Sequence, residues 1–187
     1  HHAPQRVHQP SAQILEVLQT ARKMTGAAIV LITHDLGVIA GIADRVAVMY
    51  AGAIVETGTV DDVFYRPRMP YTLGLLGSIP RADRGERAPL TPIEGTPPSL
   101  VDLPDGCPFV PRCPMRQDRC TSAEPALLPV TRAGVATLQR SACHFRDEIE
   151  QRGLTSRDVF RAPPLQPSPL AARPREESER GVVVPEA

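Results

Sequence analysis

The sequence predicts an α/β fold that gives way to an extension of a different kind. Apolar residues recur at helical spacing across residues 11–24, and a continuous apolar run fills residues 27–33. Two of the 21 prolines lie in residues 1–66 and 19 lie after them, whereas about 5% is the usual share. A helix followed by a buried strand is typical of α/β proteins. We therefore expect that fold in residues 11–66 and turn-rich structure beyond it.

The first predicted elements are a helix and a buried strand. Ser11 is a suitable N-cap, the helix continues to about Met24, and Gly26 ends it. The run AAIVLIT at residues 27–33 lacks polar alternation. Such a run is typical of a strand covered on both faces in a parallel sheet.

The next residues predict a short helix and a hairpin. A helix is expected over residues 36–43, followed by strands at 45–50 and 53–58 that turn at Ala51-Gly52. The sequence Thr-Val-Asp-Asp at 59–62 combines a cap residue with acidic side chains in the first turn, which predicts another helix.

The rest of the chain divides by composition. Residues 1–10 form a His/Pro/Gln-rich stub without periodicity, and residues 67–149 are rich in proline and cysteine. The latter segment has amphipathic stretches at about 71–78 and 135–139 but little core, so it is expected to need an external staple. Residues 150–187 are rich in Pro, Arg and Glu, and we expect a disordered tail.

The charge balance argues against a nucleic-acid partner. The chain has 21 Lys and Arg, 21 Asp and Glu, and no Trp, so neither bulk positive charge nor a stacking platform is available. No apolar run reaches the roughly 18 residues that span a bilayer, and residues 1–10 do not resemble a signal peptide. The expected compartment is the cytoplasm, where cysteines are more often metal ligands or free thiols than disulfides.

His34 is the first candidate site residue. It follows the predicted strand at 27–33, and ligands of open α/β sheets bind beyond the carboxyl ends of strands. A neutral imidazole there can donate one hydrogen bond and accept another, which suits a terminal phosphate. Taken alone, a histidine at this position is more often a loop residue without function.

The surrounding segment strengthens the functional interpretation. Residues 30–58, VLITHDLGVIAGIADRVAVMYAGAIVETG, resemble the ATP-binding subunit of ABC transporters, a P-loop ATPase fold. The resemblance implies that His34 contacts the γ-phosphate and the attacking water. It also implies that Asp35, the second nucleotide-site residue, lies near a loop of the partner subunit.

Four cysteines form the second candidate site: Cys107, Cys113, Cys120 and Cys143. Their spacing, C-x5-C-x6-C-x22-C, matches neither zinc fingers nor the usual ferredoxin runs. Metal ligands, free thiols and disulfides therefore all remain open. Pro108 and Pro114 stiffen the loops, and Arg112 and Arg119 are expected to favour the thiolate form. His144 is expected to lie outside the ligand set.

The extension narrows the resemblance to one branch. PYTLGLLGSIPR at 70–81, the run from Ile93 to Cys120, and SACH at 141–144 resemble the C-terminal extension of oligopeptide/dipeptide importer ATPases. The resemblance implies that the four cysteines hold a [4Fe–4S] cluster as a structural staple, with zinc as the alternative.

Motifs for ATP hydrolysis are absent from the sequence. It has no Gly-rich phosphate loop ending in Gly-Lys-Ser/Thr, no LSGGQ-type signature, and no strand ending in Asp-Glu for Mg²⁺. We expect ATP and Mg²⁺ to bind only in a complete protein, and we expect this chain alone not to hydrolyse ATP.

The leading hypothesis is a C-terminal fragment of the ATP-binding subunit of a peptide importer. Its expected partners are a second ATPase subunit, transmembrane permease subunits and an extracytoplasmic peptide-binding protein, at the cytoplasmic face of the membrane. Related importers carry nickel, so the solute stays open. The alternatives are a stand-alone iron–sulfur or zinc module and a non-functional truncated gene product.

Overall fold

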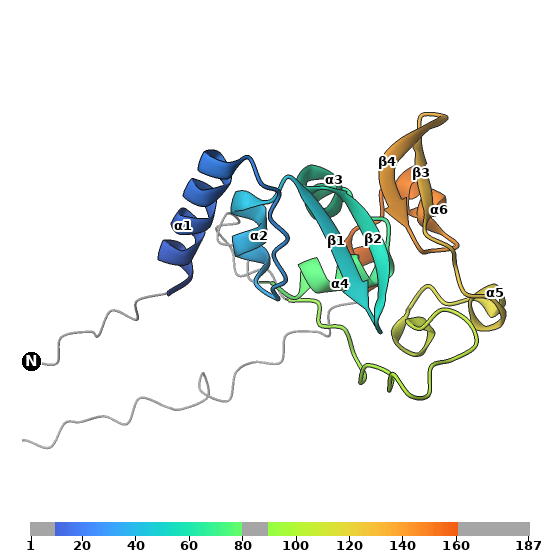
Figure 1. Ribbon diagram of the computed structural model, residues 1–187. Helices are drawn as coiled ribbons and strands as arrows, with labels where there is room; N and C mark the ends of the chain where they lie inside the picture. The colour runs from blue at the N-terminus through green and yellow to red at the C-terminus, as the bar shows by residue number, and fades with distance from the viewer. Residues whose placement is uncertain (1–9, 80–89, 161–187) are drawn as a thin grey trace, which may run out of the picture. The chain divides into compact units, whose positions relative to one another are not determined.

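The computed structural model describes residues 10–79 and 90–160 (Figure 1). The predicted stub, apart from Pro10, and residues 161–187 of the predicted tail lie outside this range. The described chain divides into two compact units, with the boundary between Ile42 and Ala43.

Two helices form the regular structure of the first unit. Helix α1 spans Pro10–Thr25, and Gly26 ends it with a φ of +67°, donating its N–H to the Arg22 carbonyl at 2.8 Å. Only glycine adopts that left-handed conformation without steric cost. Helix α2 spans Leu36–Ile42. Both helices confirm the predictions for residues 11–24 and 36–43.

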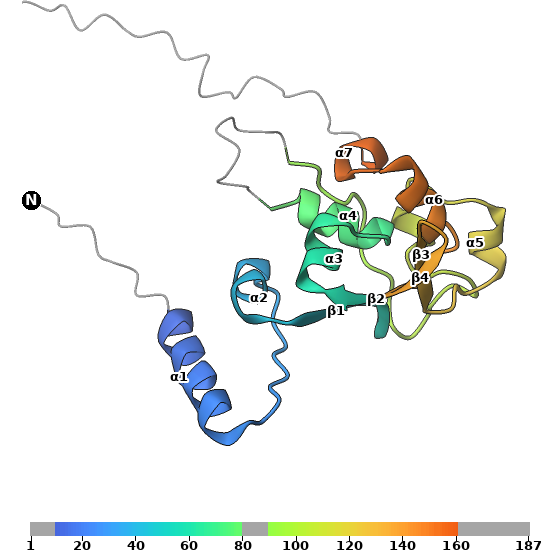
Figure 2. The ribbon, with the colours of Figure 1, turned by 90° about the horizontal axis from the view of Figure 1, so that it is seen from above.

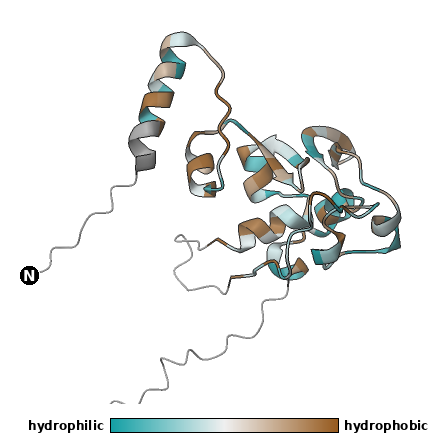
Figure 3. Cartoon of the chain, turned by 60° about the horizontal axis from the view of Figure 1, so that its bottom comes forward, coloured by the Kyte–Doolittle hydropathy of each residue, from teal (hydrophilic) through white to brown (hydrophobic). Residues whose placement is uncertain are grey.

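The predicted buried strand at 27–33 is not formed. These hydrophobic residues (Figure 3) run as irregular chain, with side-chain exposures of 89% at Val30 and 90% at Ile32. A strand is stabilised by hydrogen bonds to neighbours, and no strand among the described residues pairs with this segment. The prediction of a parallel sheet is therefore wrong for the described chain.

The second unit begins with the predicted hairpin. Strand β1 (Arg45–Tyr50) and strand β2 (Ala53–Thr59) pair antiparallel. At the turn Ala51 and Gly52 both have positive φ, +48° and +82°, as two-residue hairpin turns require. Buried and exposed side chains alternate along β1, so one face of the strand covers a core.

The predicted helix after the hairpin is also present. Helix α3 spans Val60–Tyr65. Its capping box is complete, because the Thr59 hydroxyl accepts from the Asp62 N–H at 3.1 Å while the Asp62 carboxylate accepts from the Thr59 N–H at 3.3 Å.

Two strands of the extension complete an antiparallel sheet. Strands β3 (Leu128–Arg132) and β4 (Val135–Ser141) form a second hairpin, and the strand order is β1-β2-β4-β3. Strand β4 pairs with β2, with Glu56 opposite Ser141. The amphipathic stretch predicted at 135–139 is thus a strand. The extension shares a sheet with the first hairpin, and the expectation that residues 67–149 need an external staple stays a prediction.

Short helices cover this sheet and its loops. They are α4 (Pro70–Gly77), the 3₁₀ turn η1 (Val110–Arg112), α5 (Asp118–Ser122), α6 (Arg146–Arg152) and α7 (Ser156–Val159). The core that they enclose includes fully buried Phe109, Met69, Val130 and Ile149. These four side chains come from separate segments, so burial of their apolar surface holds the unit together.

Helix α4 is buried on most of its surface rather than on one face. Helix α7 packs against it (Figure 2). A Cβ at Gly77 would lie 1.9 Å from the Ser156 hydroxyl, so only glycine allows this approach. The predicted disordered tail from residue 150 is wrong for residues 150–160, where Val159 and Phe160 are buried.

Every helix in residues 10–79 and 90–160 is too short or too polar to cross a bilayer.

Candidate functional site

The four predicted cysteines lie around one small cavity of the second unit. All four are buried free thiols, and they line this space together with apolar side chains such as Met69 and Phe109. The structure therefore brings together the residues whose spacing alone left three interpretations open.

Three different local structures position the thiols. The Cys107 N–H donates to the Cys120 carbonyl at 2.8 Å, which holds the loop before η1 against α5. Cys113 follows η1 directly and donates its N–H to the Val110 carbonyl at 3.2 Å. Cys143 follows β4 and accepts the Phe145 N–H at its Sγ at 3.4 Å. Hydrogen bonds from backbone N–H groups thus position each loop.

Burial favours the neutral thiol form of three cysteines, Cys107, Cys113 and Cys143. It raises the pKa of Cys107, and it raises the pKa of Cys113 and Cys143 to about 12. The negative charges that the neighbouring cysteines would carry add to this effect at all three residues. A buried group of four thiolates therefore needs a cation among them, which a metal ion or cluster supplies.

The four sulfur atoms are suitable metal ligands, but their arrangement in this structure does not form a metal site. Four sulfur ligands are the set used by tetrahedral zinc and by [4Fe–4S] clusters. Within the described residues, however, no three Cys, His, Asp or Glu side chains are grouped closely enough to hold a metal ion. The cavity measures about 20 Å³, room for one water molecule. The cysteine loops would therefore have to rearrange to admit a cluster.

The arginines that flank the cysteines are engaged elsewhere. Arg112 donates to the carbonyls of Glu94 and Ile93 at 3.0 and 3.1 Å. Arg119 donates to the His144 carbonyl and lies 4.8 Å from the centre of the Phe145 ring. Neither arginine is among the largest influences on the pKa of Cys107, Cys113 or Cys143, and their role in favouring thiolates stays a prediction.

Arg116 and His144 also lie near the site in the sequence or in space. The cation that lowers the pKa of Cys113, against burial, is Arg116. His144 lies beside Cys143, but its Nε2 is 3.0 Å from the Ala123 carbonyl. Because a carbonyl only accepts, Nε2 carries the proton, and Nδ1 is the ring nitrogen left to accept a hydrogen bond or bind a metal. The expected place of His144 outside the ligand set stays a prediction.

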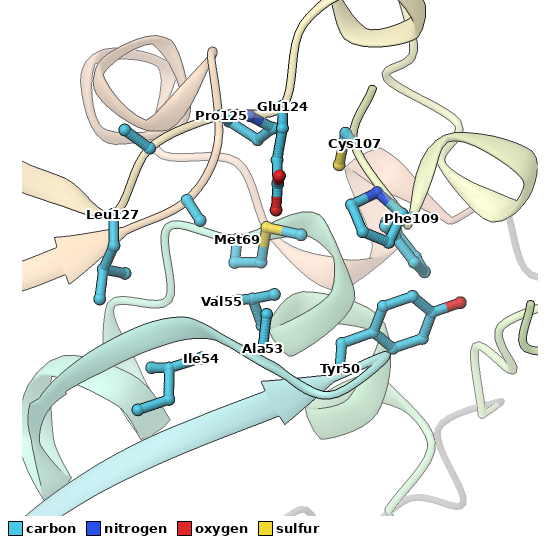
Figure 4. A pocket seen from close by; sticks show the side chains of 13 residues that line it. Tyr50, Ala53, Ile54, Val55, Met69, Cys107, Phe109, Glu124, Pro125 and Leu127 are labelled. Carbon is cyan, nitrogen blue, oxygen red and sulfur yellow. The ribbon is translucent and has the colours of Figure 1, made fainter. Parts of the chain in front are cut away.

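A larger cavity of about 390 Å³ adjoins the cysteine site. Met69, Cys107 and Phe109 line both spaces, and Figure 4 shows them facing Tyr50 across the larger one. Tyr50, Tyr71 and Phe109 form an aromatic cluster with ring centres 4.6 to 5.6 Å apart. The sequence analysis did not identify this cluster. Its only signal was the inward position of Tyr50 in the alternating strand β1.

His34 and Asp35 lie in the first unit. His34 is exposed between the irregular segment and α2. The Asp35 carboxylate accepts the N–H groups of Gly37 and Val38 at 2.9 and 3.2 Å, so Asp35 caps α2. This cap holds the backbone next to His34, while the nucleotide roles of both residues stay predictions.

A buried polar cluster in the second unit was also missed. Glu56 and Gln139 are fully buried, and Gln139 Nε2 donates to Glu56 Oε1 at 2.9 Å. The pairing register shifts between Val48 and Met49, and on β2 the adjacent residues Val55 and Glu56 are both buried. Strict alternation would place Glu56 on the opposite face to Val55, so no periodic signal identified it.

Comparison with known proteins finds a family match within this unit. Residues 55–120 match the family described as the oligopeptide/dipeptide transporter, C-terminal region. This match contains three of the cysteines and ends at Cys120, while Cys143 lies beyond it.

Individual relatives extend the similarity. An oligopeptide transport ATP-binding protein of Mycobacterium tuberculosis is 49% identical over 173 residues, 92% of this chain and 26% of the relative. A dipeptide transport ATP-binding protein of Bacillus subtilis is 56% identical over 148 residues, 79% of this chain and 42% of the relative. A Salmonella typhimurium oligopeptide transport ATP-binding protein is 51% identical over 114 residues, which are 61% of this chain and 34% of the relative. The chain therefore spans about a quarter to two fifths of the length of these relatives.

Proposed function

We propose that this chain is the C-terminal part of an ATP-binding subunit of a peptide-importing ABC transporter, because residues 55–120 match the C-terminal family of oligopeptide/dipeptide transporters. The family match is the observation that carries this proposal. The printed names of the relatives agree, because each is a peptide transport ATP-binding protein.

The partners of such a subunit follow from the same premise. A second ATPase subunit, transmembrane permease subunits and an extracytoplasmic peptide-binding protein would complete the importer. The chain would act at the cytoplasmic face of the membrane. The phosphate loop, the signature and the Asp-Glu strand are absent from these 187 residues, so ATP and Mg²⁺ would bind only where other sequence supplies those motifs.

His34 is the residue of this chain that would act in ATP hydrolysis. Its imidazole is exposed, and the Asp35 cap of α2 fixes the adjacent backbone. Exposure leaves both ring nitrogens accessible to a γ-phosphate oxygen and to the attacking water. Asp35 would lie at the contact with the second ATPase subunit while its side chain caps α2.

The experiment is a peptide-uptake assay on cells that carry His34→Ala in the chromosomal gene. Uptake of a radiolabelled dipeptide is expected to fall to the background of a gene deletion, because the γ-phosphate contact is lost. His8→Ala, a second histidine in the predicted stub, is the matched control and is expected to take up dipeptide normally. Full uptake by the His34→Ala cells would refute the proposed role.

The four cysteines are proposed to hold a [4Fe–4S] cluster, with a single zinc ion as the alternative. Support comes from their burial around one cavity and from the four-sulfur donor set, which zinc and [4Fe–4S] clusters use. The metal would tie the loops before and after η1 to helix α5 and to the end of β4, and so would staple the extension.

Metal analysis of the anaerobically purified chain separates the two forms. Iron and acid-labile sulfide in equal amounts indicate the cluster, whereas zinc without sulfide indicates the zinc site. Cys113→Ser is expected to lose the metal. The control Ser122→Ala, on exposed Ser122 of α5, is expected to keep it. Absence of both metals from the unaltered chain would overturn the ligand assignment.

A stand-alone metal-binding module is the second candidate function. The observation that favours it is that the unit beginning at Ala43 has its own sheet, its own core and all four cysteines. Normal dipeptide uptake after gene deletion, together with metal in the purified chain, would favour this candidate over the transporter subunit.

A further inference from the structure

Glu56 is a buried carboxyl group at the junction between the first hairpin and the extension. Its Oε1 accepts the Arg68 N–H at 2.6 Å and Gln139 Nε2 at 2.9 Å. Gln139 lies on β4, and Arg68 lies in the segment between α3 and α4. The Ser141 hydroxyl, opposite Glu56 in the sheet, donates to the Arg68 carbonyl at 2.8 Å. One carboxyl oxygen thus links β2 to two other parts of the fold.

Three of the cations around Glu56 are paired with other carboxylates. The charged side chains on the surrounding elements are Arg45 of β1, Asp61 and Asp62 of α3, Arg66 and Arg68 before α4, Arg132 of β3, Arg140 of β4, and Arg146, Asp147, Glu148, Glu150 and Arg152 of α6. Arg66 pairs with Asp62 at 3.1 Å. Arg68 pairs with Glu150, and Arg132 lies 3.3 Å from Glu150 and 3.6 Å from Asp62. Among the described residues, none forms an ion pair with Glu56.

The second oxygen of Glu56 lacks a partner. Oε2 is buried, and no hydrogen bond reaches it from the part of the chain that the structure describes. The Thr72 hydroxyl acts on this carboxyl from helix α4 and is also buried without a partner. The Thr72 hydroxyl can donate to the ionised carboxyl, and this contact lowers the pKa of Glu56 against the effect of burial. A proton on Oε2 would remove a buried charge that has no paired cation, which is costly in an apolar interior.

We propose that Glu56 is a proton-dependent joint that holds the first hairpin, strand β4 and helix α4 together. In the neutral form the carboxyl keeps both hydrogen bonds at Oε1 and carries no charge into the core. In the ionised form a charge without a paired cation remains in the core, and the packing of β2 against β4 and α4 loosens.

The energetic sign follows from burial. Burial raises the pKa of Glu56 from 4.5 to about 7, against opposition from hydrogen bonds and from the charge of Arg68. Between these two pH values the unfolded chain loses its proton and the folded chain keeps it. Stability is therefore lost as the pH rises from 4.5 to about 7, and the loss is complete above 7. The rise in the pKa of Glu56 from 4.5 to about 7 corresponds to a change of about 300-fold in the unfolding equilibrium constant.

The direct test is an NMR titration of the 187-residue chain. The Glu56 side-chain carbon is expected to titrate near pH 7. The Arg68 amide and the Gln139 side-chain amide are expected to shift with the same midpoint. In Glu56→Gln these two amide signals are expected to stay constant over that range. A Glu56 midpoint near 4.5, or a titration that leaves both amides unmoved, would overturn the joint.

Unfolding in urea provides a second measurement. Glu56→Gln keeps the shape of the neutral carboxyl, and its amide can donate to Thr72. Its stability relative to the unaltered chain is expected to increase between pH 4.5 and 7, towards the 300-fold limit. Glu94→Gln, at an exposed glutamate, is the control and is expected to show no such trend. A constant difference between Glu56→Gln and the unaltered chain at every pH would contradict the proposal.

Discussion

Gly106 occupies a position where the backbone of the cysteine site leaves no room for a side chain. A Cβ at this residue would lie 2.2 Å from the Cys120 carbonyl oxygen and 2.7 Å from the Thr121 carbonyl carbon. The Cys120 oxygen is the acceptor for the Cys107 N–H at 2.8 Å. Gly106→Ala therefore has to separate the loop that carries Cys107 from helix α5.

The cost of this substitution has two parts. Both obstructing atoms belong to the backbone, so a rotamer change cannot relieve the overlap, and such overpacking costs about 1–3 kcal/mol. Separation also breaks the hydrogen bond from Cys107 to Cys120, which is worth about 1 kcal/mol. We expect Gly106→Ala to lower the free energy of unfolding by about 3 kcal/mol.

The assay is urea unfolding of the metal-free chain, followed by near-ultraviolet circular dichroism of the clustered tyrosines. Gly41→Ala is the control, since a Cβ at Gly41 of α2 meets no atom within 4 Å. It is expected not to destabilise the chain. The reasoning fails if Gly106→Ala unfolds within about 0.5 kcal/mol of the unaltered chain, the range of an ordinary surface substitution.

Three further substitutions or conditions test the packing, the cap and the charges. Phe109→Ala is expected to cost about 3–5 kcal/mol in urea unfolding, because it empties a fully buried site. Thr59→Val is expected to lower the thermal unfolding midpoint through the loss of about 1 kcal/mol from the α3 cap. Burial acts to raise the pKa of Asp62, but hydrogen bonds from Thr59 and Arg66 hold it below 3.8. Stability measured against pH should therefore fall as the pH drops below 3.8 and, because of Glu56, fall again from 4.5 towards 7.

Each of these expectations has a contradicting result. Tyr65→Ala, at an exposed aromatic residue of α3, is the control for Phe109→Ala, and equal losses from the two would refute the assigned core. An unchanged midpoint in Thr59→Val would show that the capping box contributes nothing measurable. Stability that rises steadily from pH 4.5 to 7 would contradict the sign worked out for Glu56.

The local elements of the fold were predictable because their signals are local. The turn at Ala51-Gly52 and the Thr59 cap depend on neighbouring residues, and both formed as expected. The sheet order was not predictable in this way, since Gln139 and Glu56 meet across 83 residues of sequence. The apolar run at 27–33 predicted a strand, but a strand also requires a pairing partner, which the described residues do not provide.

The candidate site shows the same limit. Cysteine spacing and resemblance identified Cys107 and its three counterparts, and the structure groups all four around one cavity. Spacing did not show that Arg112 and Arg119 donate to backbone carbonyls. The burial of Glu56 depends on a shifted strand register and on Gln139 from β4. Neither feature leaves a periodic trace in the sequence.

The most direct test of the proposed function is solute uptake by cells with and without the gene. Deletion is expected to abolish uptake of a radiolabelled dipeptide, and a restored gene copy is expected to recover it, with nickel uptake unchanged in both strains. Dipeptide uptake that continues at the normal rate after deletion would contradict a role in peptide import. Loss of nickel uptake alone would assign the chain to an importer of a different solute.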